Sequence, residues 1–442
     1  MKRYILGIML ILCMGIMGCG AIPSAEMEEK TLTLAVFQSQ YGGETSSGNF
    51  DLLQWAERYH EEHPDVKIEI VNYLENYSDP YEAINQIKIE ISAGNGPDMI
   101  NFGSLYSPLD ASCGMMEDLY PFMENDESFD KQDHYYNILQ AFDTGNSLYV
   151  LVPSYRIDSY ATVNRDLTGL DSMNIGQLVD AYNKLDDESI LFPGETKRAV
   201  FGMICYGSLE NYVDWDEGIC SFNGDSFKEI LKFADQFPSE LDWENEDSAK
   251  TVFREGRALL YPVNVDNVFD ITGTRMLFGG TPTYIGYPFD SGYGGMATVA
   301  DLAVGISSTS KYKEEAWEFI SSLLDSGFQD NVKGLPVRVS SLEQRIADAM
   351  QAEYKENGEK IVKEVLRFDG EEPDYIYEMS AEDAETLRSV ISKIEHNATV
   401  DRNLYNILLE EVDHIFIDGR SVDEVADIIQ NRASIYISES KL

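Results

Sequence analysis

The pattern of apolar and polar residues in the first part of the chain switches between the two spacings that distinguish strands from helices. Three ranges have the short β-branched or alternating runs of strands, namely Thr31–Phe37, Val66–Tyr73 and Asp98–Phe102. Between them, Phe50–His63 and Tyr81–Ala93 place apolar residues three or four positions apart, as one face of a helix requires. This β-α-β-α-β order predicts an α/β fold with a parallel sheet flanked by helices.

The same patterns continue along the chain. Leu148–Pro153 and Ser159–Asn164 are predicted strands, whereas Lys313–Leu324 and Ser421–Tyr436 are predicted helices. A chain of 442 residues is too long for one hydrophobic core. We therefore expect two lobes.

The amino terminus has the features of an export signal. Lys2 and Arg3 precede the uncharged apolar run Tyr4–Met17, which is too short to span a bilayer comfortably. The run closes on Gly18 and Cys19, a pattern that resembles the lipobox of bacterial lipoproteins. The resemblance implies that residues 1–18 are a signal peptide, that Cys19 is lipidated, and that residues 19–30 form a flexible tether.

Composition changes this picture in two ways. The chain has 78 acidic and 33 basic residues and a formal charge of -45, so it should be repelled by nucleic acid and by anionic lipid surfaces. Contact with the membrane is expected only through the lipid anchor. Beyond the anchor lie Cys113, Cys205 and Cys220, which allow at most one disulfide and require none.

Several segments, taken in order, resemble the bacterial extracellular solute-binding proteins of carbohydrate ABC transporters, family 1. They are Trp55–Val71, Ile91–Phe102, Gly114–Met123, Asn146–Leu167, Phe253–Leu260, Asp301–Leu324, Gly334–Ser340 and Gly419–Arg432. Each segment alone is mainly structural. Their order behind a lipoprotein signal makes the resemblance specific.

The resemblance implies a two-lobed periplasmic-binding-protein-like fold of type II, with a mostly parallel sheet in each lobe and a hinge between them. It implies one lobe of residues 31–154 plus 301–340, and another of residues 155–300 plus 341–442. The implied protein is a monomer without catalytic residues, metal or cofactor, lipid-anchored on the extracellular face of the cell membrane. It would capture a sugar or oligosaccharide in the cleft between the lobes and deliver it to ABC permease subunits by hinge closure.

Candidate ligand-binding residues follow the ends of predicted strands, because ligands of open α/β sheets bind beyond the carboxyl ends of the strands. These candidates are Gln38, Tyr41, Glu44, Asn101, Ser104, Tyr155, Arg156, Asn264, Asp266 and Tyr293. Trp215 and Trp243 lie in polar stretches and are candidates for stacking on a sugar ring.

Two features leave the ligand open. Arg156 could bind a carboxylate or phosphate, although a salt bridge to Asp158 or Asp166 is the simpler expectation. Asn264 and Asp266 stand where many relatives have an aromatic residue, which leaves room for a smaller polar ligand. A peptide, an amino acid or a polyol therefore remains an alternative to a sugar.

Two further function classes fit the sequence less well. A glycoside hydrolase needs two carboxylates at a defined separation, and 78 acidic residues make any such pair uninformative. His60 and His63 are three positions apart, whereas the zinc-binding helix motif needs four, and no G-x-S-x-G motif occurs. A surface scaffold or adhesin lipoprotein would explain the anchor and the acidity, but not the ordered series of segments.

Overall fold

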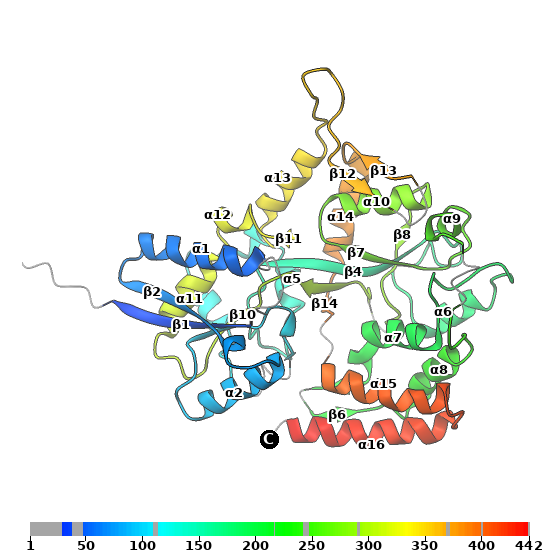
Figure 1. Cartoon of the computed structure of the whole chain (residues 1–442), viewed down its shortest axis with the longest axis horizontal. Helices are drawn as coiled ribbons and strands as arrows, with labels where there is room; N and C mark the ends of the chain where they lie inside the picture. Colours follow the sequence, from blue (N-terminus) through cyan, green and yellow to red (C-terminus); the bar gives the residue numbers. More distant parts are fainter. Residues whose placement is uncertain are drawn as a thin grey trace, which may run out of the picture.

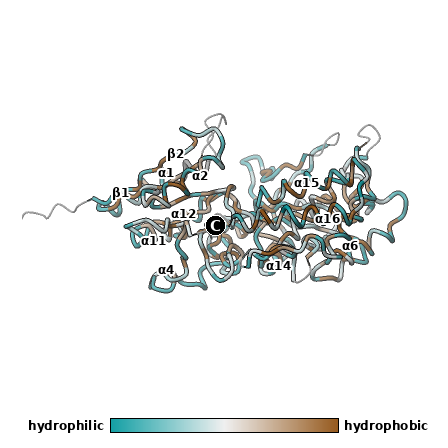
Figure 2. The backbone as a smooth tube through the Cα atoms, turned by 90° about the horizontal axis from the view of Figure 1, so that it is seen from below, coloured by the Kyte–Doolittle hydropathy of each residue, from teal (hydrophilic) through white to brown (hydrophobic). Residues whose placement is uncertain are grey.

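The computed structural model describes residues 29–37, 47–108, 114–215, 217–241, 247–289, 292–367, 372–398 and 401–440. It shows two lobes side by side, each built on its own sheet (Figure 1). Figure 2 shows the more hydrophilic stretches mainly at the outer loops of both lobes. The α/β class and the two-lobed architecture are thus confirmed.

The first sheet has four strands in the order β10-β3-β1-β2. The strands are β1 (Lys30–Val36), β2 (Val66–Asn72), β3 (Met99–Asn101) and β10 (Val304–Ile306). The first three are parallel, and β10 returns antiparallel beside β3. The helices of this lobe include α1 (Ser47–Glu62), α2 (Pro80–Ser92), α4 (Tyr120–Asn125), α5 (Tyr136–Gln140), α11 (Lys313–Ser322) and α12 (Ser326–Gln329). The predicted strands and helices of the first hundred residues are confirmed.

The second sheet is organised around one long central strand, β4 (Ser154–Thr162). Its other strands are β7 (Tyr261–Val265), β8 (Thr283–Tyr284), β9 (Met296–Val299), β11 (Leu335–Pro336) and β14 (His396–Asn397). All partners of β4 are antiparallel to it, and only β14 and β9 are parallel. The expectation of a mostly parallel sheet therefore holds for the first lobe and not for this one. Strand β4 leads out of the first lobe and β9 leads back into it, so the two must run in opposite directions.

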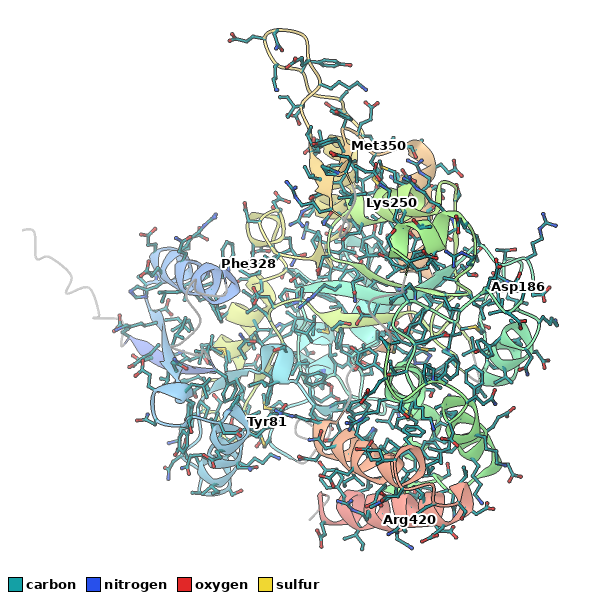
Figure 3. All side chains as sticks on the ribbon, turned by 45° about the vertical axis from the view of Figure 1, so that its right-hand side comes forward. Tyr81, Asp186, Lys250, Phe328, Met350 and Arg420 are labelled. Carbon is teal, nitrogen blue, oxygen red and sulfur yellow. The ribbon has the colours of Figure 1, made fainter. Side chains whose placement is uncertain are left out.

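Helices cover both faces of the second sheet (Figure 1). Above it in that view lie α10 (Phe269–Phe278), α13 (Val339–Ala349) and α14 (Ala381–Ser392). Below it lie α7 (Lys197–Ser208), α8 (Asp225–Ala234), α15 (Arg402–Phe416) and α16 (Val422–Ser440). The remaining elements are β5 (Val213–Asp214), β6 (Ile219–Cys220), α6 (Ile175–Tyr182), α9 (Ala249–Arg254), β12 (Glu364–Leu366), β13 (Asp374–Ile376) and short 3-10 turns. Figure 3 shows a narrow arm that projects beyond Met350 and returns to β12.

Two apolar cores result from this arrangement. Ile157, Val265 and Ala297, on one face of the second sheet, join the core that also fills the first lobe. Tyr160 and Met296, on its other face, join a separate core with α6, α7, α8, α15 and α16. The two faces of one sheet are thus buried in different cores.

The chain passes between the sheets at three closely packed segments. Val337 N–H donates to Pro153 O over 3.2 Å, and Ala300 N–H donates to Ser154 O over 3.3 Å. The predicted strands at 148–153 and 159–164 were wrong in their bounds, because the continuous strand begins directly after Pro153. Proline has no N–H for a ladder, and within residues 148–152 only Leu151 forms a bridge, to Val304.

Candidate functional site

Alternation along β4 sorts its side chains onto two faces. Arg156 and Asp158 lie on one face, whereas Tyr155, Ile157 and Ser159 lie on the other. Asn264 of β7 stands opposite Asp158, and Thr298 of β9 stands opposite Arg156. Polar residues of three neighbouring strands therefore gather on the same face, close to where the chain passes to the first lobe.

The carboxylate of Asp158 is the centre of this group and is only 7% exposed. It accepts hydrogen bonds from Thr298 Oγ1 over 2.7 Å, from Tyr206 Oη over 3.2 Å and from Asn264 Nδ2. Burial, and then the charge of Asp158, raise the pKa of Tyr206 far above its usual range, so that hydroxyl remains a donor. These three hydrogen-bond donors, from three elements, replace the water molecules that the Asp158 carboxylate loses on burial.

Arg156 presents a more accessible cation. Its Nε lies 3.2 Å from Asp266 Oδ1, and its Nη2 donates to Ala300 O over 3.2 Å. The two side chains are 39% and 54% exposed. An exposed pair of this kind contributes little to stability, so its hydrogen-bonding groups can exchange water for a ligand.

Asn101 lies in the first lobe and binds the other end of the short segment from Ala300 to Ala303, which connects β9 to β10. It ends β3, is 4% exposed, and its Oδ1 accepts from Gly103 N–H over 3.1 Å and from Ala303 N–H over 3.0 Å. Because Arg156 binds Ala300 and Asn101 binds Ala303, side chains from both sheets form hydrogen bonds to one short connection. We call the polar group on the second-lobe side of this connection the junction cluster. Its members are Arg156, Asp158, Tyr206, Asn264, Asp266 and Thr298.

The structure brings together three of the predicted site residues, Arg156, Asn264 and Asp266, and places Asn101 across the connection from them. Ser104 lies exposed in the short turn Gly103–Leu105 directly after Asn101. Arg156 pairs with Asp266 rather than with the expected Asp158 or Asp166.

Tyr155 and Tyr293 differ from the prediction in their surroundings. Tyr155 is 0% exposed on the opposite face of β4, and Tyr293 is 5% exposed, with its Oη 2.9 Å from Ser159 Oγ. Since neither side chain has appreciable exposed surface, this arrangement does not favour ligand contact by either. Trp215 is half-buried and packs against the second core. The other predictions, Gln38, Tyr41, Glu44, Trp243 and Cys19, lie outside the described residues.

Asp158, Tyr206 and Thr298 belong to the junction cluster but were not among the residues predicted from the sequence. The spacing of Arg156 and Asp158 within one strand was the available signal, because residues two apart share a face. Tyr206 and Thr298 gave no local signal, since they meet Asp158 only through packing of α7 and pairing of β9.

Several other site types find no support within the described ranges. No helix there is long and apolar enough to cross a membrane. No group of three histidine, cysteine or acidic side chains in those ranges could hold a metal ion. Cys205 and Cys220 are free thiols, and Cys113 lies outside these ranges.

Comparisons with known proteins bear on the family and the fold of the chain. Residues 45–330 match the family model described as "Bacterial extracellular solute-binding protein". The sequence matches no curated protein.

Solved structures show the same fold at low sequence identity. An oligogalacturonide-binding protein of Yersinia enterocolitica superposes with a TM-score of 0.58 at 12% identity, covering 93% of this chain and 100% of that one. The sugar-binding protein MalE of Xanthomonas citri gives a TM-score of 0.55 at 13% identity, covering 93% and 98%. An extracellular solute-binding protein, family 1, of Alicyclobacillus acidocaldarius gives 0.53 at 12% identity, covering 92% and 98%.

At these identities the structural likeness establishes the fold alone. The family match spans more than half of the chain and confirms the resemblance seen in the sequence. Proteins of this family bind small solutes outside the cytoplasm for ABC transporters. The chain belongs to the family of bacterial extracellular solute-binding proteins.

Proposed function

We propose that this protein is the substrate-binding lipoprotein of an ABC importer and that it captures a sugar or short oligosaccharide between its lobes. The observation that carries the proposal is the junction cluster, which groups donors and acceptors where the two sheets meet. Cys19 would anchor the protein on the extracellular face, and the monomer would deliver its ligand to the permease. The proposed lobes are residues 31–154 with 301–340, and residues 155–300 with 341–442.

The chemistry of the cluster suits hydroxyl groups. Each sugar hydroxyl both donates and accepts, and the cluster offers the guanidinium of Arg156, the carboxylate of Asp266 and the amide of Asn264. Hydrogen bonds to charged partners are roughly twice as strong as neutral ones. Tyr206 is the one aromatic member, which favours a small polar ligand over a long stacked chain. Trp215 and Trp243 remain proposed stacking residues.

The pairing of Arg156 with Asp266 favours a neutral ligand over an anion. An anion would have to displace the carboxylate of Asp266 to reach the guanidinium. It would also approach the buried charge of Asp158. A neutral sugar, by contrast, can bond to both partners of the pair without separating them.

Binding would favour closure because the cluster lies at the connection between the lobes. Ala300–Ala303 is bonded by Arg156 on one side and by Asn101 on the other. A ligand that contacts both lobes only when they approach shifts the equilibrium toward the closed form. We propose that the permease recognises this form. No catalytic group is needed for such a cycle.

A thermal-shift screen of the purified protein against sugars, polyols, amino acids and short peptides tests the ligand class. A ligand at a hundredfold excess over its Kd should stabilise the folded state by about 2.7 kcal/mol. Asp266→Asn should weaken binding of the hit by about tenfold or more, because it removes a charged acceptor. Asp166→Asn is the matched control, since Asp166 is 49% exposed and ion-paired to Lys184.

A shift with an amino acid or peptide and none with carbohydrates would keep the importer and reject the sugar. No shift with any compound would favour a scaffold or adhesin. The anchor is tested separately. Cys19→Ser should release the protein from the membrane fraction, and retention there would contradict lipidation at Cys19.

A further inference from the structure

A contact between side chains joins the two lobes away from the segments that connect them. Arg402, at the start of α15 in the second lobe, places its guanidinium carbon 4.9 Å from the centroid of the Tyr81 ring, at the start of α2 in the first lobe. This distance is within the range of a cation–π interaction. Figure 1 shows α2 and α15 below β4 and β11, where the chain passes between the lobes, and Figure 3 labels Tyr81 on the side of the first lobe that faces α15.

Capping aspartates fix the backbone on both sides of this contact. Asp79 caps α2, and its carboxylate accepts a hydrogen bond from the Tyr81 N–H over 2.7 Å. Asp401 caps α15, and its carboxylate accepts from the Leu404 N–H over 2.8 Å. Each cap stabilises the first turn of its helix. The two side chains of the contact therefore project from helix ends whose positions are well defined.

The position of Arg402 is unfavourable for α15 itself. The amino-terminal end of a helix carries a partial positive charge, so a cation in the first turn is destabilising there. The face of the Tyr81 ring and the carboxylate of Asp79 compensate this cost from the other lobe. Hydrogen bonding to Tyr81, and the nearby charge of Asp79, raise the pKa of Arg402. A residue that opposes its own helix and is compensated across an interface points to a role at that interface.

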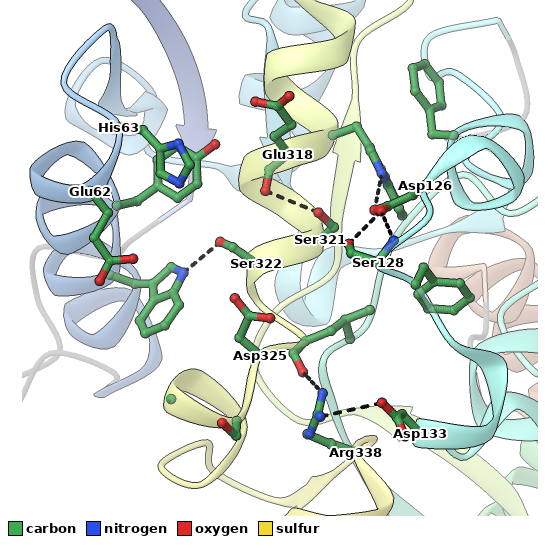
Figure 4. A pocket seen from close by; sticks show the side chains of 18 of the residues that line it. Glu62, His63, Asp126, Ser128, Asp133, Glu318, Ser321, Ser322, Asp325 and Arg338 are labelled. Atoms are coloured by element: carbon green, nitrogen blue, oxygen red, sulfur yellow. Dashed lines mark hydrogen bonds and ion pairs between the residues drawn. The ribbon is translucent and has the colours of Figure 1, made fainter.

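Both helices are anchored in the core of their own lobe. Ile84 of α2 is buried in the core that fills the first lobe, and Leu404 of α15 is buried in the separate core of the second. Hydrogen bonds between helices add to this anchoring, as where Trp55 Nε1 of α1 donates to Ser322 Oγ of α11 over 2.9 Å (Figure 4). Opening of the lobes should therefore change the connections and not the lobes themselves. It would separate the ring from the guanidinium.

From these observations we infer that Tyr81 and Arg402 form a latch between the lobes, which favours the closed form and so strengthens capture of the ligand. The inference rests on the proposed function in one respect, namely that the lobes open and close about their connections. Both lobes contribute to the formal charge of -45, so like charges oppose closure. The latch counteracts this repulsion. A ligand that binds the closed form then finds a larger fraction of molecules ready to bind.

Single-molecule energy transfer between dyes on the two lobes tests the latch in the purified protein without added ligand. Unnatural amino acids at Ile89 of α2 and Ile417 at the end of α15, which are 63% and 75% exposed, carry the dyes and leave the cysteines unmodified. Arg402→Ala and Tyr81→Ala should each raise the ratio of open to closed molecules about twofold to fivefold, as expected for an exposed cation–π interaction. The double variant should show no further rise, because either single change already breaks the contact.

Three variants separate the latch from general effects. Arg402→Lys keeps a cation, so its ratio should lie between those of the wild type and Arg402→Ala. Arg198→Ala removes the same charge from the same lobe, where Arg198 lies 3.5 Å from Asp413 of α15. Tyr375→Ala removes an exposed tyrosine of β13, at the opposite end of the molecule in Figure 1. The last two variants should leave the ratio unchanged.

Two results would overturn the latch alone. One is an unchanged ratio in Arg402→Ala and Tyr81→Ala, and the other is effects that multiply in the double variant, as independent residues would give. A single inter-dye distance in every variant would overturn both the latch and hinge closure. With a ligand from the thermal-shift screen, the Kd of each variant should rise in inverse proportion to its closed fraction. If the variants change the ratio and no compound binds, the latch stands and the importer function is rejected.

Discussion

At the scale of single residues, Asp158 and Tyr59 differ in whether a buried polar group meets a partner. Asp158 receives donors from Thr298, Tyr206 and Asn264, so its charge is tolerated at 7% exposure. Tyr59 is equally buried and receives none within the described residues. The Asp158 network positions its exposed neighbours, whereas burial raises the pKa of Tyr59 far above its usual range and keeps its hydroxyl protonated.

Asp143 should make stability fall as the pH rises from about 4 to about 6. Burial raises its pKa from 3.8 to about 6, the Tyr120 hydroxyl at 2.6 Å opposes this, and the charge of Asp118 adds to it. Between those values the folded state keeps a proton that the unfolded state has lost. The free energy of unfolding from this group is therefore greatest below about pH 4 and declines until about pH 6.

Urea unfolding of wild type and Asp143→Asn at several pH values measures this contribution. The variant cannot ionise, so its stability relative to the wild type should increase from pH 4 to pH 6 and then level off. Asp166→Asn, at an exposed surface position, should show no such trend. A constant difference between Asp143→Asn and wild type across this window would contradict the role of Asp143.

At the scale of elements, Gly334 lies where the three connections between the lobes approach one another closely around a residue without a side chain. Its φ is +71°, and a Cβ added there would lie 2.7 Å from Ala300 Cβ and 2.7 Å from Tyr155 O. Gly358 has a similar φ of +83° and nothing within 4 Å of an added Cβ. A side chain at either glycine would strain the backbone, but only at Gly334 would it also collide with neighbouring atoms.

Gly334→Ala should therefore destabilise the protein more than Gly358→Ala. Positive φ costs an alanine roughly 1 kcal/mol in both variants. Crowding at Gly334 should add about 1–3 kcal/mol, because the connections cannot separate without breaking their hydrogen bonds. Equilibrium unfolding of both variants measures the difference. Equal losses would show that the connections yield readily at this point.

The spacing of apolar residues was sufficient to predict those elements whose buried face is visible in their own sequence. Strands β1, β2 and β3 and helices α1 and α2 were predicted within a few residues. Strand β4 was misplaced, since apolar residues 148–152 are buried without forming a continuous ladder. Arg156, Asn264 and Asp266 could be named as candidates from the sequence because they lie within or directly after the strands that form the junction. Thr298 and Tyr206 were missed because register and packing between distant segments decide their position.

At the scale of the whole molecule, the excess of acidic residues works against the compact state. The formal charge is -45, so folding brings many like charges closer together. The ion pairs of the described surface, such as Lys184–Asp166 and Lys355–Glu359, are largely exposed. Pairs of this kind contribute only about 0–1 kcal/mol each. Added salt should therefore relieve more repulsion between like charges than it removes attraction within these ion pairs.

We expect the Tm to rise when sodium chloride is increased from about 0.01 M to about 1 M, which shortens the screening length from about 30 Å to about 3 Å. Because screening changes fastest at low salt, most of the increase should occur below about 0.2 M. Calorimetric scans at closely spaced concentrations distinguish this from exclusion of salt from the protein surface, which would raise the Tm steadily up to the highest concentration. A fall in Tm over the first additions would instead show that surface ion pairs dominate. Such a fall would mean that attraction within ion pairs contributes more to stability than repulsion from the formal charge of -45 takes away.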